Sequence, residues 1–329
     1  MNTNKEHILK LRELIFNTLS PLINKDYCLL DIPDHVNIGD QLIAGGEFAF
    51  LQRIPHKMLY TSNDRLCQME KIPVGSVILF HGGGNFGDLW RGFQEFRLDV
   101  IKRFPHNRII ILPQTVHYKD PEMLKQDAAE FSKHPDLTIC VRDSRSFELM
   151  KEHFVHNKIF MLPDMAFNLD FDQYISMKDT GKALLLERVD QEIGKGFNPI
   201  EFANKVRNGK QIEIRDWPSI KKGTIEGKVK GALHRANGVL SKALINVPVI
   251  KEQIDHRYGF MSEDLAHDYA IKGINYINEY DVIYTTRLHG FILSVLLNKE
   301  VYMIDNSYGK NSTFFNAWMK DFEKVHLIQ

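Results

Sequence analysis

The feature that most constrains the fold of this chain is a repeated alternation of short apolar segments with helical segments. Between residues 27 and 165, apolar runs of four or five residues alternate with stretches at helical spacing; the runs lie in CLLDIP, SVILF, RIIIL, LTICV and KIFML. Buried parallel strands give such runs, and the helices between them supply the crossover connections. This region therefore predicts a doubly wound parallel sheet, in which ligands bind at the carboxyl ends of the strands.

The same alternation returns in the second half of the chain. Its predicted strands lie in KALLLERVD, QIEIRDWP, DVIYTTR and EVYMIDN. At 329 residues the chain is also about twice the length of a typical domain. We expect an α/β protein of two Rossmann-like doubly wound domains, residues 1–170 and 180–329, with a linker near 168–182 and a ligand cleft between the domains.

Charge, cysteine content and hydropathy exclude several classes of protein. Lys and Arg number 42, as do Asp and Glu, so the global positive field of a generic nucleic-acid binder is absent. The three cysteines are dispersed and form no CxxC pair, which fits neither a disulfide framework nor a zinc site. The first 19 residues are predicted to form an amphipathic helix, and no apolar run reaches the roughly 18 residues that cross a bilayer. We expect a cytoplasmic protein.

One segment of this electrically neutral chain is locally basic. Residues 205–251 hold eleven Lys or Arg residues against three Asp or Glu. Such an insertion can lie on an anionic membrane surface, which would place the protein peripherally at the inner face of the membrane, or it can meet an acidic saccharide. A solvated helical face is the alternative, and the sequence leaves all three open.

A first candidate site follows CLLDIP, where a predicted strand gives way to a helix. Asn37 and Gly39 tolerate the turn, and Asp40 can cap the helix while it presents a carboxylate to a ligand. A simple helix cap explains the same residues equally well, so this motif alone does not separate the two interpretations.

A second candidate is the glycine-rich segment HGGGNFGD, residues 81–88, which follows SVILF. Its three consecutive glycines let backbone amides approach a ligand and can form an anion-binding nest at the start of a helix, so we expect a loop that faces a ligand. The segment is neither a Walker A loop nor a GxGxxG motif. Polar residues follow two more predicted strands, Gln114 after RIIIL and Arg142 after LTICV, and we expect them at the rim of the same cleft.

A third candidate is the segment TRLHG after the predicted strand DVIYT. Arg287 can grip a phosphate or a carboxylate with two hydrogen bonds, and His289 can transfer a proton near neutral pH. Two further cations follow predicted strands, Arg188 after ALLLE and Lys310 after EVYMIDNSYG. No metal site is expected, because the acidic residues near strand ends are scattered without compact ligand spacing.

The motifs taken together resemble those of the polysaccharide pyruvyl transferase family. The resemblance rests on NIGDQLI, HGGGNFGDLW, LPQTVHY, VRDSRSFELM, LPDMAF, TTRLHGFILSVLL and DNSYGKN, which follow the family's order across nearly the whole chain. Residues 190–260 match none of these motifs. The glycine-rich and RLHG segments are the most diagnostic pair.

The resemblance implies a fold similar to GT-B glycosyltransferases and transfer of the enolpyruvyl group of phosphoenolpyruvate to sugar hydroxyls, giving a pyruvate ketal in an exopolysaccharide, capsule or other envelope glycan. It implies that the second domain binds the donor, through Arg287, Leu288, His289, Arg188 and Lys310. We expect the first domain to bind the acceptor, through Asn37, Asp40, His81, Gly83, Gly84, Asn85, Asp88 and Gln114.

The implied chemistry assigns roles to three of these residues. His289 would be the general acid, Arg287 would stabilise charge on the donor, and Asp40 would bind or deprotonate the acceptor hydroxyl, with His81 as a rival base. No cofactor is expected beyond the donor substrate. A nucleotide sugar or a lipid-linked oligosaccharide would serve as acceptor.

Two other functions remain open at this level. A glycosyltransferase with a nucleotide-sugar donor would share the architecture, because fold does not fix function. A non-catalytic partner in glycan assembly could also keep the cleft as a binding site.

Overall fold

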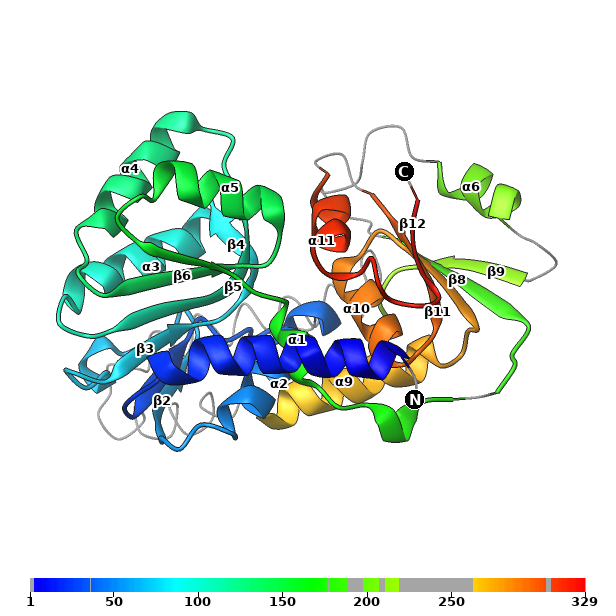
Figure 1. The fold of residues 1–329 in the computed structure, drawn as a ribbon, viewed down its shortest axis with the longest axis horizontal. Coiled ribbons are helices and arrows are strands. Elements are labelled where there is room, and N and C mark those ends of the chain that lie inside the picture. The colour runs from blue at the N-terminus through cyan, green and yellow to red at the C-terminus, as the bar shows by residue number, and fades with distance from the viewer. Residues whose placement is uncertain are drawn as a thin grey trace.

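The structure is a computed structural model that describes residues 3–35, 37–176, 178–187, 198–206, 211–218, 263–305 and 309–328. It contains two parallel β-sheets interleaved with helices, one built from each half of the chain (Figure 1). The prediction of an α/β protein with two Rossmann-like sheets is confirmed.

The first sheet has seven strands in the order β2-β1-β3-β5-β6-β7, with β4 paired to β5, and all its pairings are parallel. Its strands are β1 (Tyr27–Leu30), β2 (Met58–Ser62), β3 (Val77–Phe80), β4 (Gly83–Gly87), β5 (Ile109–His117), β6 (Leu137–Val141) and β7 (Lys158–Met161). The helices are α1 (Thr3–Leu19), α2 (Ile38–Leu51), α3 (Arg91–Arg103), α4 (Pro121–Ser132) and α5 (Ser144–His153).

Local sequence explains where these elements form. Strands β1, β3 and β6 are buried at every position, as their uninterrupted apolar runs predict for strands covered on both faces. The helices α2, α4 and α5 each begin after a residue whose side chain caps the first turn: Asn37, Asp120 and Asp143. Their starts therefore lie where the sequence places a capping residue behind a strand.

The second sheet has five parallel strands in the order β12-β11-β10-β8-β9. Its strands are β8 (Lys182–Leu186), β9 (Gln211–Arg215), β10 (Val282–Thr285), β11 (Glu300–Ile304) and β12 (Val325–Ile328). The helices around it are α6 (Pro199–Val206), α9 (Glu263–Ile277), α10 (Leu288–Leu296) and α11 (Lys310–Trp318).

Helix α1 packs against both halves of the molecule (Figure 1). Ile8 and Leu11 belong to the hydrophobic core around the second sheet, whereas Ile15 and Leu19 belong to a core of the first. At the start of α1, Asn4 Oδ1 accepts a hydrogen bond of 2.7 Å from the backbone N–H of Glu323. The two sheets thus share core residues, while the domain ranges 1–170 and 180–329 stay a prediction.

The glycine-rich segment differs from its predicted form. Residues 83–87 form strand β4, which pairs with the extended end of β5, and helix α3 begins only at Arg91. The predicted position of this segment at a helix start is therefore wrong, while its binding of an anion stays a prediction. Gly87 has φ 119° and a Cβ there would lie 1.9 Å from the backbone oxygen of His117, so the glycines allow close strand pairing.

Each sheet contains a point where the strand order reverses. In the first sheet β1 has β2 on one side and β3 on the other, and in the second β8 lies between β9 and β10. Crevices at the carboxyl ends of such strand pairs are the usual ligand sites of open α/β sheets. The structure therefore has two such crevices, one for each half.

Most of the basic segment 205–251 lies outside the described residues, so the membrane and saccharide interpretations of it remain predictions. Among the helices that the structure does describe, none combines the length and the apolar character needed to cross a membrane.

Candidate functional site

A pocket of about 370 Å³ lies between the two halves and brings both crevices together. From the first sheet, its wall includes residues after β1 and β3, such as Asp31 and His81. From the second sheet, it includes Trp217 after β9 and Arg287 after β10. Strand ends that are far apart in the sequence thus meet at one cavity.

Eight of the residues predicted for the site lie in the wall of this pocket: Asn37, Asp40, His81, Gly84, Asn85, Arg287, Leu288 and His289. Gly83, Asp88 and Gln114 are not among its lining residues. Asp88 instead accepts backbone hydrogen bonds from Lys119 and Asp120, and the buried Gln114 donates to the backbone oxygen of His81 at 2.7 Å. Arg188 and the side chain of Lys310 lie outside the described part of the structure.

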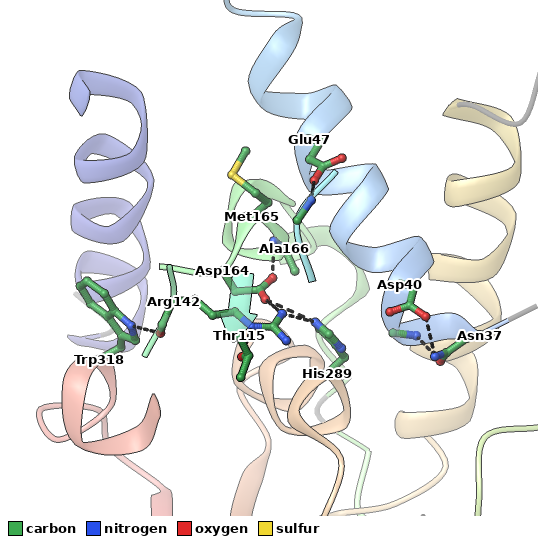
Figure 2. Close-up of polar contacts among 12 residues, drawn as sticks. Asn37, Asp40, Glu47, Thr115, Arg142, Asp164, Met165, Ala166, His289 and Trp318 are labelled. Atoms are coloured by element: carbon green, nitrogen blue, oxygen red, sulfur yellow. Dashed lines mark hydrogen bonds and ion pairs between the residues drawn. The ribbon is translucent and has the colours of Figure 1, made fainter. Parts of the chain in front are cut away.

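His289 meets two charged residues of the first half (Figure 2). Its Nε2 lies 3.3 Å from Nη1 of Arg142 and 3.4 Å from Oδ2 of Asp164. The unprotonated nitrogen can accept from Arg142, and the protonated nitrogen can donate to Asp164. Each protonation state of His289 has a partner, which suits a residue that exchanges a proton.

Arg142 and Asp164 form a buried ion pair beside this histidine. Arg142 is also held by Thr115, which accepts from its Nε at 3.0 Å, and Trp318 donates to the Arg142 backbone oxygen at 2.8 Å. Burial by itself would raise the pKa of Asp164, but the charges of Arg142 and His289 outweigh it and hold that pKa well below its usual range. Asp164 is therefore a fixed negative charge.

The first turn of α2 lies directly against His289. A Cβ at Gly39 would lie 2.8 Å from Nδ1 of His289 and 3.1 Å from its Cβ. Packing therefore explains the glycine of the NIGD motif, because only a residue without a side chain leaves room for His289.

Arg287 makes a two-point ion pair with Asp216, the residue that follows β9. Its Nε and Nη2 donate to the two carboxylate oxygens, the second at 2.7 Å. Both side chains are more than nine-tenths buried. This pairing fixes the plane of the guanidinium at the pocket wall, as planar Arg–carboxylate pairs do.

His81 is held by Glu47, which lies on helix α2. Its Nδ1 lies 2.8 Å from one Glu47 oxygen, and the other oxygen accepts from the backbone N–H of Gly82 at 2.7 Å. Burial lowers the pKa of His81, but the charges of Glu47, Asp31 and Asp40 outweigh it and raise the pKa above its ordinary value. His81 therefore favours the protonated form, which suits an acid or a cation better than a base.

Asp40 lies at the N-terminus of α2 with its side chain 30% exposed to the pocket region. Its Oδ2 accepts from Asn37 at 2.7 Å and lies 3.5 Å from Nε2 of His35. Burial would raise the pKa of Asp40, but the charges of His35 and His289, with those of His81 and Arg142, lower it. Asp40 is thus an accessible carboxylate that stays ionised at neutral pH.

Asp31, directly after β1, forms a second buried ion pair in the wall. Its Oδ2 accepts from Arg97 at 2.8 Å and from Asn85 at 3.2 Å. Asn85 belongs to the same hydrogen-bond network. Its backbone oxygen and its side-chain oxygen both accept hydrogen bonds from Arg97. Burial raises the pKa of Asp31 to about 6 despite the charge of Arg97.

Several residues of the site received no prediction: Asp31, Glu47, Trp90, Phe93, Arg97, Asp164, Asp216 and Trp217. Arg142 was expected at the rim of the cleft and does line the pocket, but no chemical role was predicted for it. For Asp31, Arg142, Asp216 and Trp217 a signal existed, since each follows a predicted strand. For Glu47 and Arg97 no local signal existed, because they lie inside helices and meet their partners only in the folded chain.

Within the described residues, no group of three or more His, Cys, Asp or Glu side chains is placed to hold a metal ion. The predictions that no metal and no cofactor are required stay predictions.

The fold and the site define a class: an α/β protein of two parallel sheets, whose strand ends enclose one pocket with Arg, His and carboxylate groups. Comparison with known proteins then gives the family. The family model described as "Polysaccharide pyruvyl transferase" matches residues 37–308. The chain belongs to the polysaccharide pyruvyl transferase family, and the resemblance expected from its motifs is confirmed.

Individual relatives agree with this family. The chain is 31% identical to "Putative pyruvyl transferase EpsO" of Bacillus subtilis, over 99% of this chain and 96% of that protein. It is 26% identical to "Pyruvyl transferase 1" of Schizosaccharomyces pombe, over 90% and 70% of the two chains. A functionally uncharacterised protein from Klebsiella pneumoniae has a similar solved structure, with a TM-score of 0.64 at 21% identity over 97% of this chain and 98% of that chain. That likeness concerns the fold alone.

Proposed function

We propose that this protein transfers the enolpyruvyl group of phosphoenolpyruvate to a sugar with two suitably placed hydroxyls, forming a pyruvate ketal and inorganic phosphate. The observation that carries the proposal is the meeting of Arg287 and His289, from the second half, with Arg142 and Asp40, from the first, at one pocket. The donor carries a phosphate and a carboxylate, which guanidinium groups bind well. The acceptor is a glycan or its precursor in envelope or exopolysaccharide synthesis.

The reaction needs two proton transfers and the loss of phosphate. One sugar oxygen bonds to C2 of the donor while its C3 methylene gains a proton and becomes a methyl group. The second sugar oxygen then bonds to C2 as the bond from C2 to the phosphate oxygen breaks. The two hydroxyl protons balance the one gained by the methyl group and the one taken up by phosphate.

Residues of this pocket can supply these steps. His289, which lies in the pocket wall and is held there by Arg142 and Asp164, delivers the proton to the methylene carbon. Arg287 and Arg142 stabilise the negative charge of the donor. Asp40, ionised and partly exposed, accepts the proton of the attacking hydroxyl. His81, with its raised pKa, assists the departing phosphate as a cation.

Thermal unfolding with different ligands tests the donor first. Phosphoenolpyruvate should raise the melting temperature by mass action, inorganic phosphate much less, and Arg287→Ala should abolish the effect. Formation of a sugar ketal with release of phosphate then tests the transfer. A shift with nucleotide sugars alone, together with glycosyl transfer from them, would instead support the glycosyltransferase alternative.

A further inference from the structure

Asp31 stands at the point where the strand order of the first sheet reverses. It follows β1 directly, while His81 follows the neighbouring β3, and both lie in the pocket wall. Asp31 also has φ 67°, in the left-handed region. Non-glycine residues held in this region are uncommon, and they cluster at ligand sites. Its position in the sheet and its backbone conformation both make Asp31 a candidate ligand-binding residue.

One oxygen of this carboxylate has no hydrogen-bond partner among the described residues. Arg97 and Asn85 both donate to Oδ2, whereas Oδ1 is buried and accepts no hydrogen bond from any residue that the structure describes. The Asp31 side chain is 1% exposed and Arg97 is fully buried. An unpartnered buried carboxylate oxygen is costly, so a ligand hydroxyl that donates to it would be favoured.

Two aromatic side chains lie in the wall of the same pocket. Trp90, just before α3, is 50% exposed, and Phe93 follows it by three residues in the first turn of that helix. Helix α3 also carries Arg97, the partner of Asp31. An aromatic ring offers an apolar face that can cover the C–H face of a sugar ring, while polar groups at the side fix its hydroxyls.

The charge on this wall restricts which sugar can bind. Asp34 and Asp64 lie in the same pocket wall as Asp31. Arg65 forms an ion pair with both Asp34 and Asp64. At Asp31 itself, a sugar carboxylate could not donate a hydrogen bond to Oδ1 and would meet the like charge of that side chain, which disfavours an acidic group at this point of the sugar.

We infer that Asp31, Trp90 and Phe93 form the acceptor subsite, with Trp90 and Phe93 covering one face of an uncharged pyranose ring and Asp31 Oδ1 accepting a hydrogen bond from one of its hydroxyls. The inference rests on the proposed function for the meaning of acceptor, but the binding of the sugar itself can be measured without any transfer.

Saturation-transfer NMR with the full-length protein tests binding directly. The probes are uncharged methyl pyranosides of gluco, galacto and manno configuration and the matching glucuronides and galacturonides. At least one uncharged sugar should bind, at least tenfold more tightly than its uronate. Trp90→Ala should weaken it about tenfold or more, whereas Trp90→Phe should retain most of the affinity. Binding of none of the uncharged sugars, or equal binding by Trp90→Ala, would overturn the inference.

Kinetics with the best-binding sugar separate this inference from the proposed function. Asp31→Asn and Trp90→Ala should raise the acceptor KM about tenfold and leave the phosphoenolpyruvate KM within twofold; an equal rise of both constants would indicate a general structural effect and contradict the subsite. Sugar binding that these variants weaken, without any transfer by the wild type, would reject the proposed function and keep the subsite. Transfer by the wild type that neither variant affects would keep the proposed function and reject the subsite.

Discussion

His289 Nε2 lies 3.4 Å from Oδ2 of Asp164, although the two residues are 125 positions apart and belong to different halves of the molecule. Asp164 follows β7 of the first sheet, whereas His289 lies in the first turn of α10 beside the second. The candidate acid is therefore oriented by the half of the protein opposite to its own. Correct packing of the two halves is a condition for the site to exist.

Replacement of Asp164 should lower both activity and stability. Asp164→Asn removes the negative charge from the buried pair with Arg142 and from the neighbourhood of His289. We expect a transfer rate about 100-fold lower and a loss of about 3 kcal/mol in the free energy of unfolding. Steady-state kinetics and urea unfolding measure the two effects. Asp170→Asn, at a side chain that is 66% exposed, is the matched control and should change neither.

Asp216 should act on donor binding through Arg287. Asp216→Asn removes the charge that holds the guanidinium by two hydrogen bonds. The freed guanidinium loses its fixed plane, so we expect the KM for phosphoenolpyruvate to rise about tenfold with a smaller change in kcat. Titration with phosphoenolpyruvate provides the measurement. Tighter donor binding in this variant would show that Asp216 competes with the donor.

Gly39 should tolerate no side chain. In Gly39→Ala the new Cβ would lie 2.8 Å from Nδ1 of His289, so the ring must shift from the position in which its Nε2 contacts Asp164 and Arg142. We expect kcat to fall about tenfold or more, since small displacements of reacting groups are costly. Gly92→Ala is the matched control, because nothing lies within 4 Å of a Cβ there. Equal activity of the two variants would contradict the proposed role of His289 placement.

The pH dependence of stability should report on His81. Its pKa is raised above the ordinary value of 6.5, so its contribution to stability is fully present below about 6.5 and is lost as the pH rises through the folded-state pKa. His81→Gln should flatten the decline of the unfolding free energy over that range. Urea unfolding from pH 5.5 to 9 measures the difference. A variant that declines as steeply as the wild type would show that His81 does not titrate in this way.

Much of the fold followed from local patterns. The apolar runs marked the central strands β1, β3, β6, β8 and β10, because a strand covered on both faces needs apolar residues at every position. The glycine-rich segment was misjudged, because pairing of β4 with β5 is a long-range contact that the local turn preference of glycine does not reveal. Asp40, His81, Arg287 and His289 could be proposed because polar residues behind parallel strands collect at one edge.

The sequence by itself determined most of the elements, the family and the residues at strand ends, since each depends on neighbours within a few positions. Only the tertiary structure decided the partners that set their chemistry: Asp164 beside His289, Asp216 on Arg287, Glu47 on His81 and Arg97 on Asp31. The physical reason is that the charge state and orientation of a buried side chain depend on groups within a few ångströms in space. In this protein those groups lie between 34 and 125 residues away along the chain.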